Sequence, residues 1–244
     1  MAYGVFARHY DALTANVNYN LRAVYFDSLI QKYLSGAKLL LDLACGTGSL
    51  SFEMARLGYE VIGVDASADM LSVAMHKNDD SARVIFLNQT MQGLDLYGTV
   101  DAVVCALDSI NHLTPDELSK ALERLRLFVA PRGIFVFDVN TEYKHREVLA
   151  DNCFVYEHDE VYCVWQNHLR EGCSVEITLD FFECCDNGAY ERHREQFCEY
   201  IHEDARLREM LECAGFMVLD VFEADTKNPP GPKSERVVYV AVRR

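Results

Sequence analysis

LDLACGTG, at residues 41–48, places Gly46 and Gly48 directly after an apolar run and directly before a segment of helical periodicity. Glycine lets the backbone turn tightly and approach a ligand without a Cβ in the way. Seventeen residues after Gly48, Asp65 ends the next apolar run, where a carboxylate can accept hydrogen bonds from both hydroxyls of a ribose. The glycine turn and the acidic residue together predict a cofactor that contains adenosine.

Around this stretch, short apolar runs alternate with segments of helical periodicity up to about residue 138. The predicted strands cover residues 38–42, 60–65, 83–87, 100–105 and 133–138, and the predicted helices cover 48–57, 67–77 and 114–129. TPDE at 114–117 is a capping signature at the start of the last of these helices. This alternation predicts a doubly wound parallel α/β sheet, which binds its ligands at the carboxyl ends of the strands.

Three segments flank this cofactor-binding core, which we place at residues 38–149. Residues 1–37 predict a cap of one or two amphipathic helices, and residues 203–244 predict a helix ending at Gly215 and strands at 216–223 and 235–243. Residues 150–202 alternate apolar and polar positions, with runs at 154–169, 175–182 and 190–201, which predicts antiparallel strands. The whole chain is therefore predicted to be one α/β domain, with a Rossmann-like sheet of seven strands, the last antiparallel, and an antiparallel β insert.

Composition narrows the range of partners. The chain has 244 residues and carries 23 Lys and Arg against 38 Asp and Glu, a net charge of −15, so no basic stripe is available for nucleic acid or an anionic membrane. Residues 151–202 contain twelve of the acidic residues against three Arg, and six of the nine cysteines. An odd number of cysteines without a Cys-x-x-Cys pair, and a start that lacks a leader pattern, predict reduced thiols and a cytoplasmic protein.

Several motifs, taken in order, resemble those of the class I S-adenosylmethionine-dependent methyltransferases, in their small-molecule branch. They are FARHYDAL at 6–13, LDLACGTG at 41–48, VIGVDAS at 61–67, DAVVCALDSINHL at 101–113, LRLFVAPRGIFVFDVN at 125–140, ECAGFMVLDVF at 212–222 and VVYVAV at 237–242. The resemblance implies that S-adenosyl-L-methionine is the cofactor. It also implies transfer of a methyl group to nitrogen or oxygen of a small-molecule acceptor.

The resemblance further implies which residues contact the cofactor: Tyr10, Asp42, Ala44, Gly46, Gly48, Asp65, Ala66, Met70, Thr90, Met91 and Leu107. The backbone of the glycine loop would hold the methionine part, Asp42 would orient that loop, and Tyr10 would close over the cofactor. Leu107 would lie under the methionine chain.

The adenosine end follows from the same resemblance. Asp65 would bind the ribose, and Ala66 and Met70 would flank the adenine. Thr90 and Met91 stand where the family usually has an aspartate followed by an apolar residue. The contact to the adenine amino group is therefore assigned to no single side chain, and the neighbouring residues 88–89 or a water molecule are alternatives.

Two other functions remain open at this stage. A nicotinamide dinucleotide would use the same turn and acid, although the dinucleotide fingerprint has a third glycine where this chain has Ser51. A module that binds the cofactor without turnover is the other alternative, and only Thr90 at the usual acidic position suggests it.

His112, just beyond the fourth predicted strand, is the candidate general base, because imidazole titrates in the useful range and the acceptor must approach this edge. The alternative is a histidine that caps the following helix or forms a pocket wall. Cys105 is predicted to be a small buried residue rather than a nucleophile, and the Asn-Pro-Pro sequence at 228–230 a turn. No metal site is predicted, because the histidines and cysteines of the insert lack zinc-ligand spacing.

The insert is expected to border the acceptor, with Trp165 and Tyr156 as the aromatic residues to test first. Its acidic excess suggests a negative lid that favours a cationic or neutral amine, and a solvated outer face is the alternative. The protein is predicted to be a monomer or a homodimer, since the edge of such an insert can pair with a second copy.

Overall fold

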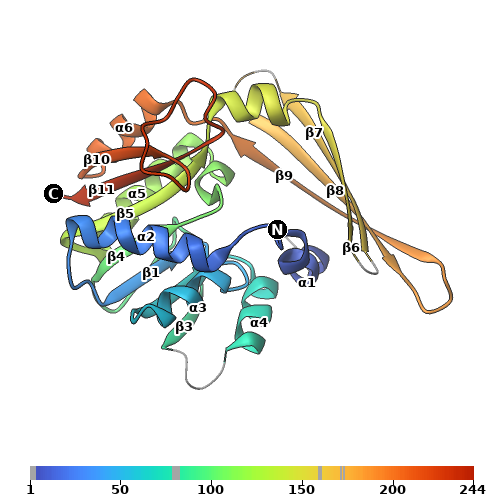
Figure 1. Ribbon diagram of the computed structural model, residues 1–244, viewed down its shortest axis with the longest axis horizontal. Coiled ribbons are helices and arrows are strands. Elements are labelled where there is room, and N and C mark those ends of the chain that lie inside the picture. The colour runs from blue at the N-terminus through green and yellow to red at the C-terminus, as the bar shows by residue number, and fades with distance from the viewer. Residues whose placement is uncertain (1–3, 79–82, 159–160, 171, 173) are drawn as a thin grey trace.

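The computed structural model describes residues 4–78, 83–158, 161–170, 172 and 174–244, and Figure 1 shows the arrangement of their elements. The elements of the core before the insert are α1 (Gly4–Leu13), α2 (Tyr19–Tyr33), β1 (Leu39–Leu43), α3 (Ser49–Arg56), β2 (Glu60–Asp65), α4 (Ala68–Lys77), β3 (Val84–Asn88), β4 (Val100–Cys105), the 3-10 helix η1 (Ser109–His112), α5 (Pro115–Phe128) and β5 (Val129–Asn140). They are followed by the π-helix η2 (Lys144–Leu149), β6 (Cys153–His158), β7 (Val161–Arg170), β8 (Ser174–Cys184), β9 (Tyr190–Tyr200), α6 (Asp204–Cys213), β10 (Phe216–Glu223) and β11 (Arg236–Arg243).

The central sheet has seven strands in the order β10-β11-β5-β4-β1-β2-β3. Strands β1 to β5 pair in parallel, whereas β11 runs antiparallel to both of its neighbours, β5 and β10. The predicted seven-stranded, doubly wound sheet with an antiparallel last strand is confirmed. All the parallel strands end at one edge, so the loops after β1, β2 and β4 lie together there.

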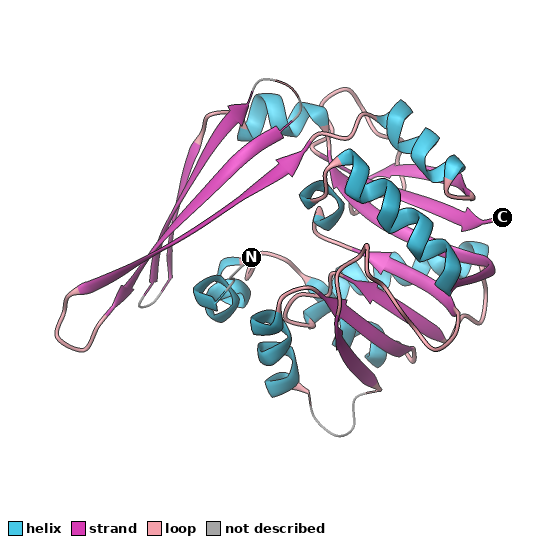
Figure 2. Ribbon diagram, turned by 180° about the vertical axis from the view of Figure 1, so that it is seen from behind, coloured by secondary structure: helices cyan, strands magenta, loops and turns pink. Residues whose placement is uncertain are grey.

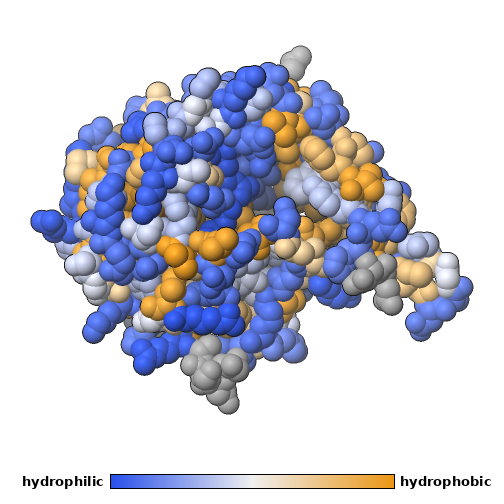
Figure 3. All heavy atoms as spheres, in the orientation of Figure 1, coloured by the Kyte–Doolittle hydropathy of each residue, from blue (hydrophilic) through white to orange (hydrophobic). Residues whose placement is uncertain are grey.

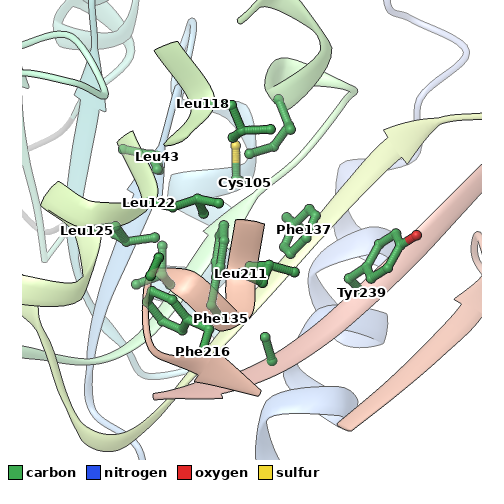
Figure 4. Close-up of a cluster of buried hydrophobic side chains, with 14 of the residues drawn as sticks. Leu43, Cys105, Leu118, Leu122, Leu125, Phe135, Phe137, Leu211, Phe216 and Tyr239 are labelled. Atoms are coloured by element: carbon green, nitrogen blue, oxygen red, sulfur yellow. The ribbon is translucent and has the colours of Figure 1, made fainter. Parts of the chain in front are cut away.

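Two apolar layers hold helices against this sheet. On one face, Leu118 and Leu122 of α5 and Leu211 of α6 pack on Phe135 and Phe137 of β5 (Figure 4). On the other face, α2 and α3 pack on alternate residues of the same strands. Both faces are covered, which explains why these strands read as continuous apolar runs.

The insert is a separate antiparallel sheet in the order β6-β7-β8-β9, and it projects from the core in Figures 1 and 2. Its inner face buries a small apolar cluster, made of Leu149, Cys163, Val175, Ile177, Leu179 and Phe181. The predicted run at 154–169 forms two strands, β6 and β7, which pair with each other in antiparallel fashion. Residues 159–160 between them lie outside the described part of the chain. A hairpin leaves the apolar alternation unchanged, so the pattern could not reveal it.

Helix α1 lies between the core and the insert in both ribbon views. On the core side, Asp11 accepts hydrogen bonds from Thr47 Oγ1 at 2.6 Å and Lys77 Nζ at 2.7 Å. On the insert side, the Phe6 amide donates to Glu195 Oε1 at 3.0 Å, and Arg8 of α1 forms an ion pair with Glu183. One short helix therefore contacts the glycine loop and the insert together.

Local details follow the sequence closely. Thr114 and Glu117 form the predicted capping box at the start of α5, and Gly215 has a φ of 84° just after α6. The residues at 228–230 lie in the loop between β10 and β11, as predicted. Strand β5 begins earlier than expected, at Val129, because it follows α5 without a loop and then pairs with β4 through an irregular register.

Two further findings concern the whole chain. Among the residues that the structure describes, no helix is long and apolar enough to cross a membrane. The eight described cysteines are free thiols, and Cys173 lies outside the described residues.

Candidate active site

The loop after β1 uses its two glycines for different reasons. Both have positive φ, 55° at Gly46 and 76° at Gly48. A Cβ at Gly48 would lie 2.8 Å from Phe86 Cζ, so this glycine is needed for the packing of α3 on the sheet. A Cβ at Gly46 would meet only Tyr10, at 4.0 Å, and would otherwise extend into open space. Gly46 therefore presents bare backbone to a ligand, while Gly48 fixes the start of the helix.

Asp65 ties this loop to the end of β2. Its carboxylate accepts hydrogen bonds from the amides of Gly46 and Ser67, each at 2.8 Å. Burial raises the pKa of Asp65, and these two hydrogen bonds act in the opposite direction. Each oxygen has a second lone pair, so a diol can still be bound by the same group.

Asp42 lies behind the loop and is almost completely buried. It accepts a hydrogen bond from Ser51 Oγ at 2.5 Å, which joins β1 to α3. Burial raises the pKa of Asp42 to about 7, because no cation offsets the loss of solvent. Ser51, where a dinucleotide fingerprint would have glycine, thus has a structural partner.

The raised pKa of Asp42 predicts a pH effect on stability. Between about pH 4 and pH 7 the folded chain holds a proton that the unfolded chain has released, so stability falls as the pH rises. From pH 5 to pH 6 we expect the wild type to lose about 1 kcal/mol relative to Asp42→Asn, which cannot ionise. Urea denaturation at both pH values measures the difference.

Asp186→Asn, in the exposed turn of the insert, is the matched control and should track the wild type at both pH values. A constant difference between the wild type and Asp42→Asn would contradict the expected proton uptake.

A small cavity of about 30 Å³ opens beside the loop, and it brings together five of the predicted cofactor residues: Tyr10, Asp42, Ala44, Gly46 and Leu107. Of the remaining predicted residues, Met70 is buried at the start of α4 and Ala66 is exposed beside Asp65. Thr90 and Met91 follow β3 and line neither this cavity nor the larger one described next.

The side chains that could replace the missing aspartate are already engaged. Asn88 donates to the Asp65 carbonyl at 3.0 Å, and Gln89 exchanges hydrogen bonds with the backbone of Asp95. The Thr90 hydroxyl accepts from the Gly93 amide at 3.1 Å. The contact to an adenine amino group therefore stays unassigned.

A second cavity, of about 980 Å³, lies between the core, the N-terminal helices and the insert, where Figure 3 shows the surface hollowed. Tyr10 and Leu107 line both cavities, so the two spaces meet at these side chains. Trp165 and Tyr156 line the large cavity, as expected from the sequence. Its volume is in the range of sites for small organic molecules.

The turn after β4 is held in an unusual conformation at this junction. Leu107 and Asp108 both have left-handed φ values, 57° and 53°. The buried carboxylate of Asp138 accepts from their amides at 3.1 and 2.6 Å, and it pairs with Arg22 of α2 at 2.8 Å. Asp138 and Arg22 were not identified from the sequence, although FDVN at the end of an apolar strand places an acid at the correct edge.

His112 lies at the wall of the large cavity, with its ring centroid 5.1 Å from that of Phe197. One of its ring nitrogens and one carboxylate oxygen each of Asp108 and Glu199 lie within 4.8 Å of one another. Such a group could hold a metal ion, but Asp108 is ion-paired with Arg236, and Glu199 has partners of its own. That no metal is bound stays a prediction.

Glu199 is the main functional candidate that the sequence did not reveal. His145 Nε2 and Asn140 Nδ2 each donate to Glu199 Oε2 at 3.0 Å. Burial acts to raise the pKa of Glu199, but the hydrogen bond from His145 and the charge of His112 outweigh it and lower that pKa. The available signal was that Glu199 shares an inward face with Phe197, where a carboxylate is unusual.

The acidic excess of the insert lies elsewhere. Among its described acidic residues, Glu199 alone lines the large cavity. Asp180 is paired with Arg192 and Arg194, Glu183 is paired with Arg8, and the half-buried Glu195 accepts a hydrogen bond from the Phe6 amide of α1. The described acidic residues of the insert thus place little charge on the cavity wall, and the preference for a cationic or neutral amine stays a hypothesis.

Cys105 is fully buried in the core cluster of Figure 4. Burial raises the pKa of its thiol, which is opposite to the shift that activates a nucleophile. Its role is packing, as predicted.

The sheet order, the glycine loop with its acid at the end of β2, and a cavity at the strand ends define a Rossmann-like enzyme with an adenosine-containing cofactor. A family model described as a methyltransferase domain matches residues 40–133. A relative from Geobacillus sp. (strain WCH70), named as a methyltransferase, is 33% identical over 245 residues, or 99% of both chains. This chain belongs to the class I S-adenosylmethionine-dependent methyltransferases.

Two further similarities concern the fold and the acceptor. A solved S-adenosylmethionine-dependent methyltransferase from Clostridium acetobutylicum covers 99% of this chain and 98% of its own, with a TM-score of 0.88 and 28% identity. A dTDP-3-amino-3,6-dideoxy-alpha-D-glucopyranose N,N-dimethyltransferase from Streptomyces fradiae is 34% identical over 122 residues, which are 50% of this chain and 47% of that protein. The nicotinamide and non-catalytic alternatives are thereby set aside.

Proposed function

We propose that this methyltransferase transfers the methyl group to nitrogen or oxygen of a small molecule bound in the 980 Å³ cavity. The observation that carries the proposal is the junction of the two cavities at Tyr10 and Leu107. A methyl donor beside the glycine loop and an acceptor in the large cavity would meet there. The name of the Streptomyces fradiae relative, an amino-sugar N,N-dimethyltransferase, supports a small-molecule acceptor.

The residues present fit the cofactor. The bare backbone of Gly46 borders the small cavity beside Ala44, where the methionine part would bind, and Asp65 offers carboxylate oxygens for the ribose. The bound cofactor supplies an electrophilic sulfonium methyl group. The chain's own contribution is then to orient the acceptor, exclude water and remove a proton where the acceptor carries one.

His112 is the proposed base for that proton. It lines the acceptor cavity just beyond β4, and one of its ring nitrogens lies within 4.8 Å of a carboxylate oxygen of Asp108 and of Glu199. A residue that only forms the wall of the cavity would not need these carboxylates nearby.

The proposal is tested with the purified protein in two steps. Calorimetric titration with S-adenosylhomocysteine should show one site, and NAD should give no heat. Labelled S-adenosylmethionine mixed with a metabolite extract should then transfer its methyl group to a compound of low molecular mass. Absence of S-adenosylhomocysteine binding, or label found only in macromolecules, would contradict the proposal.

Asp65→Asn should weaken S-adenosylhomocysteine binding at least tenfold. The amide keeps one acceptor oxygen but loses the charge, and hydrogen bonds to a charged group contribute about 1.5–3 kcal/mol. Asp69→Asn, on the exposed side of α4 four residues away, makes the same change in charge and should bind within twofold of wild type. If both variants bound S-adenosylhomocysteine with equal affinity, Asp65 would not be the residue that binds the ribose.

A further inference from the structure

Four cationic side chains line the acceptor cavity: Arg22, Lys144, Lys227 and Arg236. The two arginines are neutralised, Arg22 by Asp138 and Asp225 and Arg236 by Asp108. The ammonium groups of the two lysines have no hydrogen bond or ion pair among the residues that the structure describes. Lys227 is exposed to solvent, which screens its charge, whereas Lys144 is half-buried.

We infer that Lys144 is the anion-binding residue of the acceptor cavity and that the acceptor carries a carboxylate or phosphate group. The inference rests on the proposed function, because it concerns the acceptor of that same site. Lys144 begins η2, and a hydrogen bond from its amide to Thr141 Oγ1 at 3.1 Å fixes that helix to the end of β5. The lysine therefore extends from a fixed backbone.

The electrostatic setting of Lys144 favours an anionic ligand. Burial lowers the pKa of Lys144, and the nearby guanidinium of Arg236 lowers it further. The carboxylates of Asp108 and Glu199 act in the opposite direction without contacting it. A carboxylate or phosphate bound at Lys144 would supply the direct counter-charge that these residues do not.

A second polar atom in the same cavity also lacks a partner. The Tyr25 hydroxyl oxygen is buried and has no hydrogen bond in the described part of the chain, although the residue lines the cavity. Buried polar groups are ordinarily satisfied, so this hydroxyl would gain a partner if the Tyr25 side chain turned toward a polar ligand atom in the cavity. This observation is independent of the charges around Lys144.

The wall that the insert contributes sets the rest of the acceptor's chemistry. The insert contributes Glu199 near the core and otherwise an apolar and largely aromatic surface, made of Tyr156, Cys163, Trp165, Leu179 and Phe197. A ring or apolar body would lie against this wall while its anionic group reaches Lys144. The acceptor class is therefore an organic anion with an apolar or ring-shaped body, large enough to occupy much of 980 Å³.

The test uses three probes of the same shape, benzoate, phenyl phosphate and benzamide, titrated calorimetrically into the protein saturated with S-adenosylhomocysteine. We expect at least one anion to bind the wild type tenfold or more tightly than benzamide, which corresponds to about 1.4 kcal/mol. Which anion binds better distinguishes a carboxylate from a phosphate. Lys144→Met should reduce the preference to less than threefold, and Lys144→Arg should retain it.

Lys120→Met removes the same charge from the exposed face of α5 and should behave as wild type. The affinity for S-adenosylhomocysteine, measured in every sample, separates the possible failures. A wild type that does not bind S-adenosylhomocysteine contradicts the proposed function. A wild type that binds it but shows no preference for either anion, or a Lys144→Met variant that keeps the preference, overturns the role of Lys144.

Discussion

His112→Gln will lower the rate of methyl transfer about 100-fold, with little change in affinity for the cofactor. Glutamine keeps a polar side chain of similar reach but cannot take a proton, and positioned general bases contribute 10²–10⁴-fold to rates. The remaining rate reflects the alignment of donor and acceptor, which the substitution leaves in place. The measurement is incorporation of labelled methyl into a metabolite extract at saturating S-adenosylmethionine.

His76→Gln, an exposed position on α4, is the control and should retain at least half of the wild-type rate. The pH profile adds a second readout, because a base that must be neutral makes the wild-type rate fall on acidification, whereas the variant should lose that dependence. A His112→Gln rate within threefold of wild type would show that this residue is only a wall of the cavity.

Asp138→Asn will lower the free energy of unfolding by about 3–5 kcal/mol, the range found when one partner of a buried ion pair is removed. Arg22, itself 8% exposed, would keep only the partner Asp225. An amide also cannot accept from both the Leu107 and Asp108 amides, so the left-handed turn would lose one of its two restraints. Urea denaturation at pH 7 measures the change.

Asp101→Asn is a matched control for this effect. Asp101 also accepts two backbone hydrogen bonds, from Lys38 and Leu39 at 2.8 and 3.0 Å, but it lies at the opposite end of β4 and has no ion pair with a buried arginine. We expect it to cost about 1 kcal/mol, the usual contribution of such hydrogen bonds. Similar losses of unfolding free energy in Asp138→Asn and Asp101→Asn would mean that the ion pair with Arg22 contributes little to stability.

The cofactor half of the molecule could be predicted because its determinants are local. A strand, a glycine turn and the next helix are consecutive in the chain, so 41–48 and Asp65 indicate both the fold and the edge at which ligands bind. Residues joined only by the resemblance, such as Thr90 and Met91, could not be placed this way. The positions of their side chains depend on the conformation of the loop after β3, and in this structure they line neither cavity.

The acceptor half could not be predicted to the same extent, because its residues come from distant segments. His112 follows β4, Lys144 begins η2, Glu199 ends β9 and Arg236 begins β11. No sequence spacing records that a projecting sheet folds back over the strand ends. Charge counts are uninformative here for the same reason: they show how many acidic residues the insert has, but not which of them line the cavity.

The double attachment of α1 has a kinetic consequence. The helix holds the glycine loop through Asp11 and the insert through Phe6 and Glu195, and its Tyr10 lines both cavities. Displacing α1 would remove Tyr10 from the wall of both cavities at once, while α2 continues to line each of them. Exchange of spent cofactor and release of methylated product would then both depend on the position of this one helix.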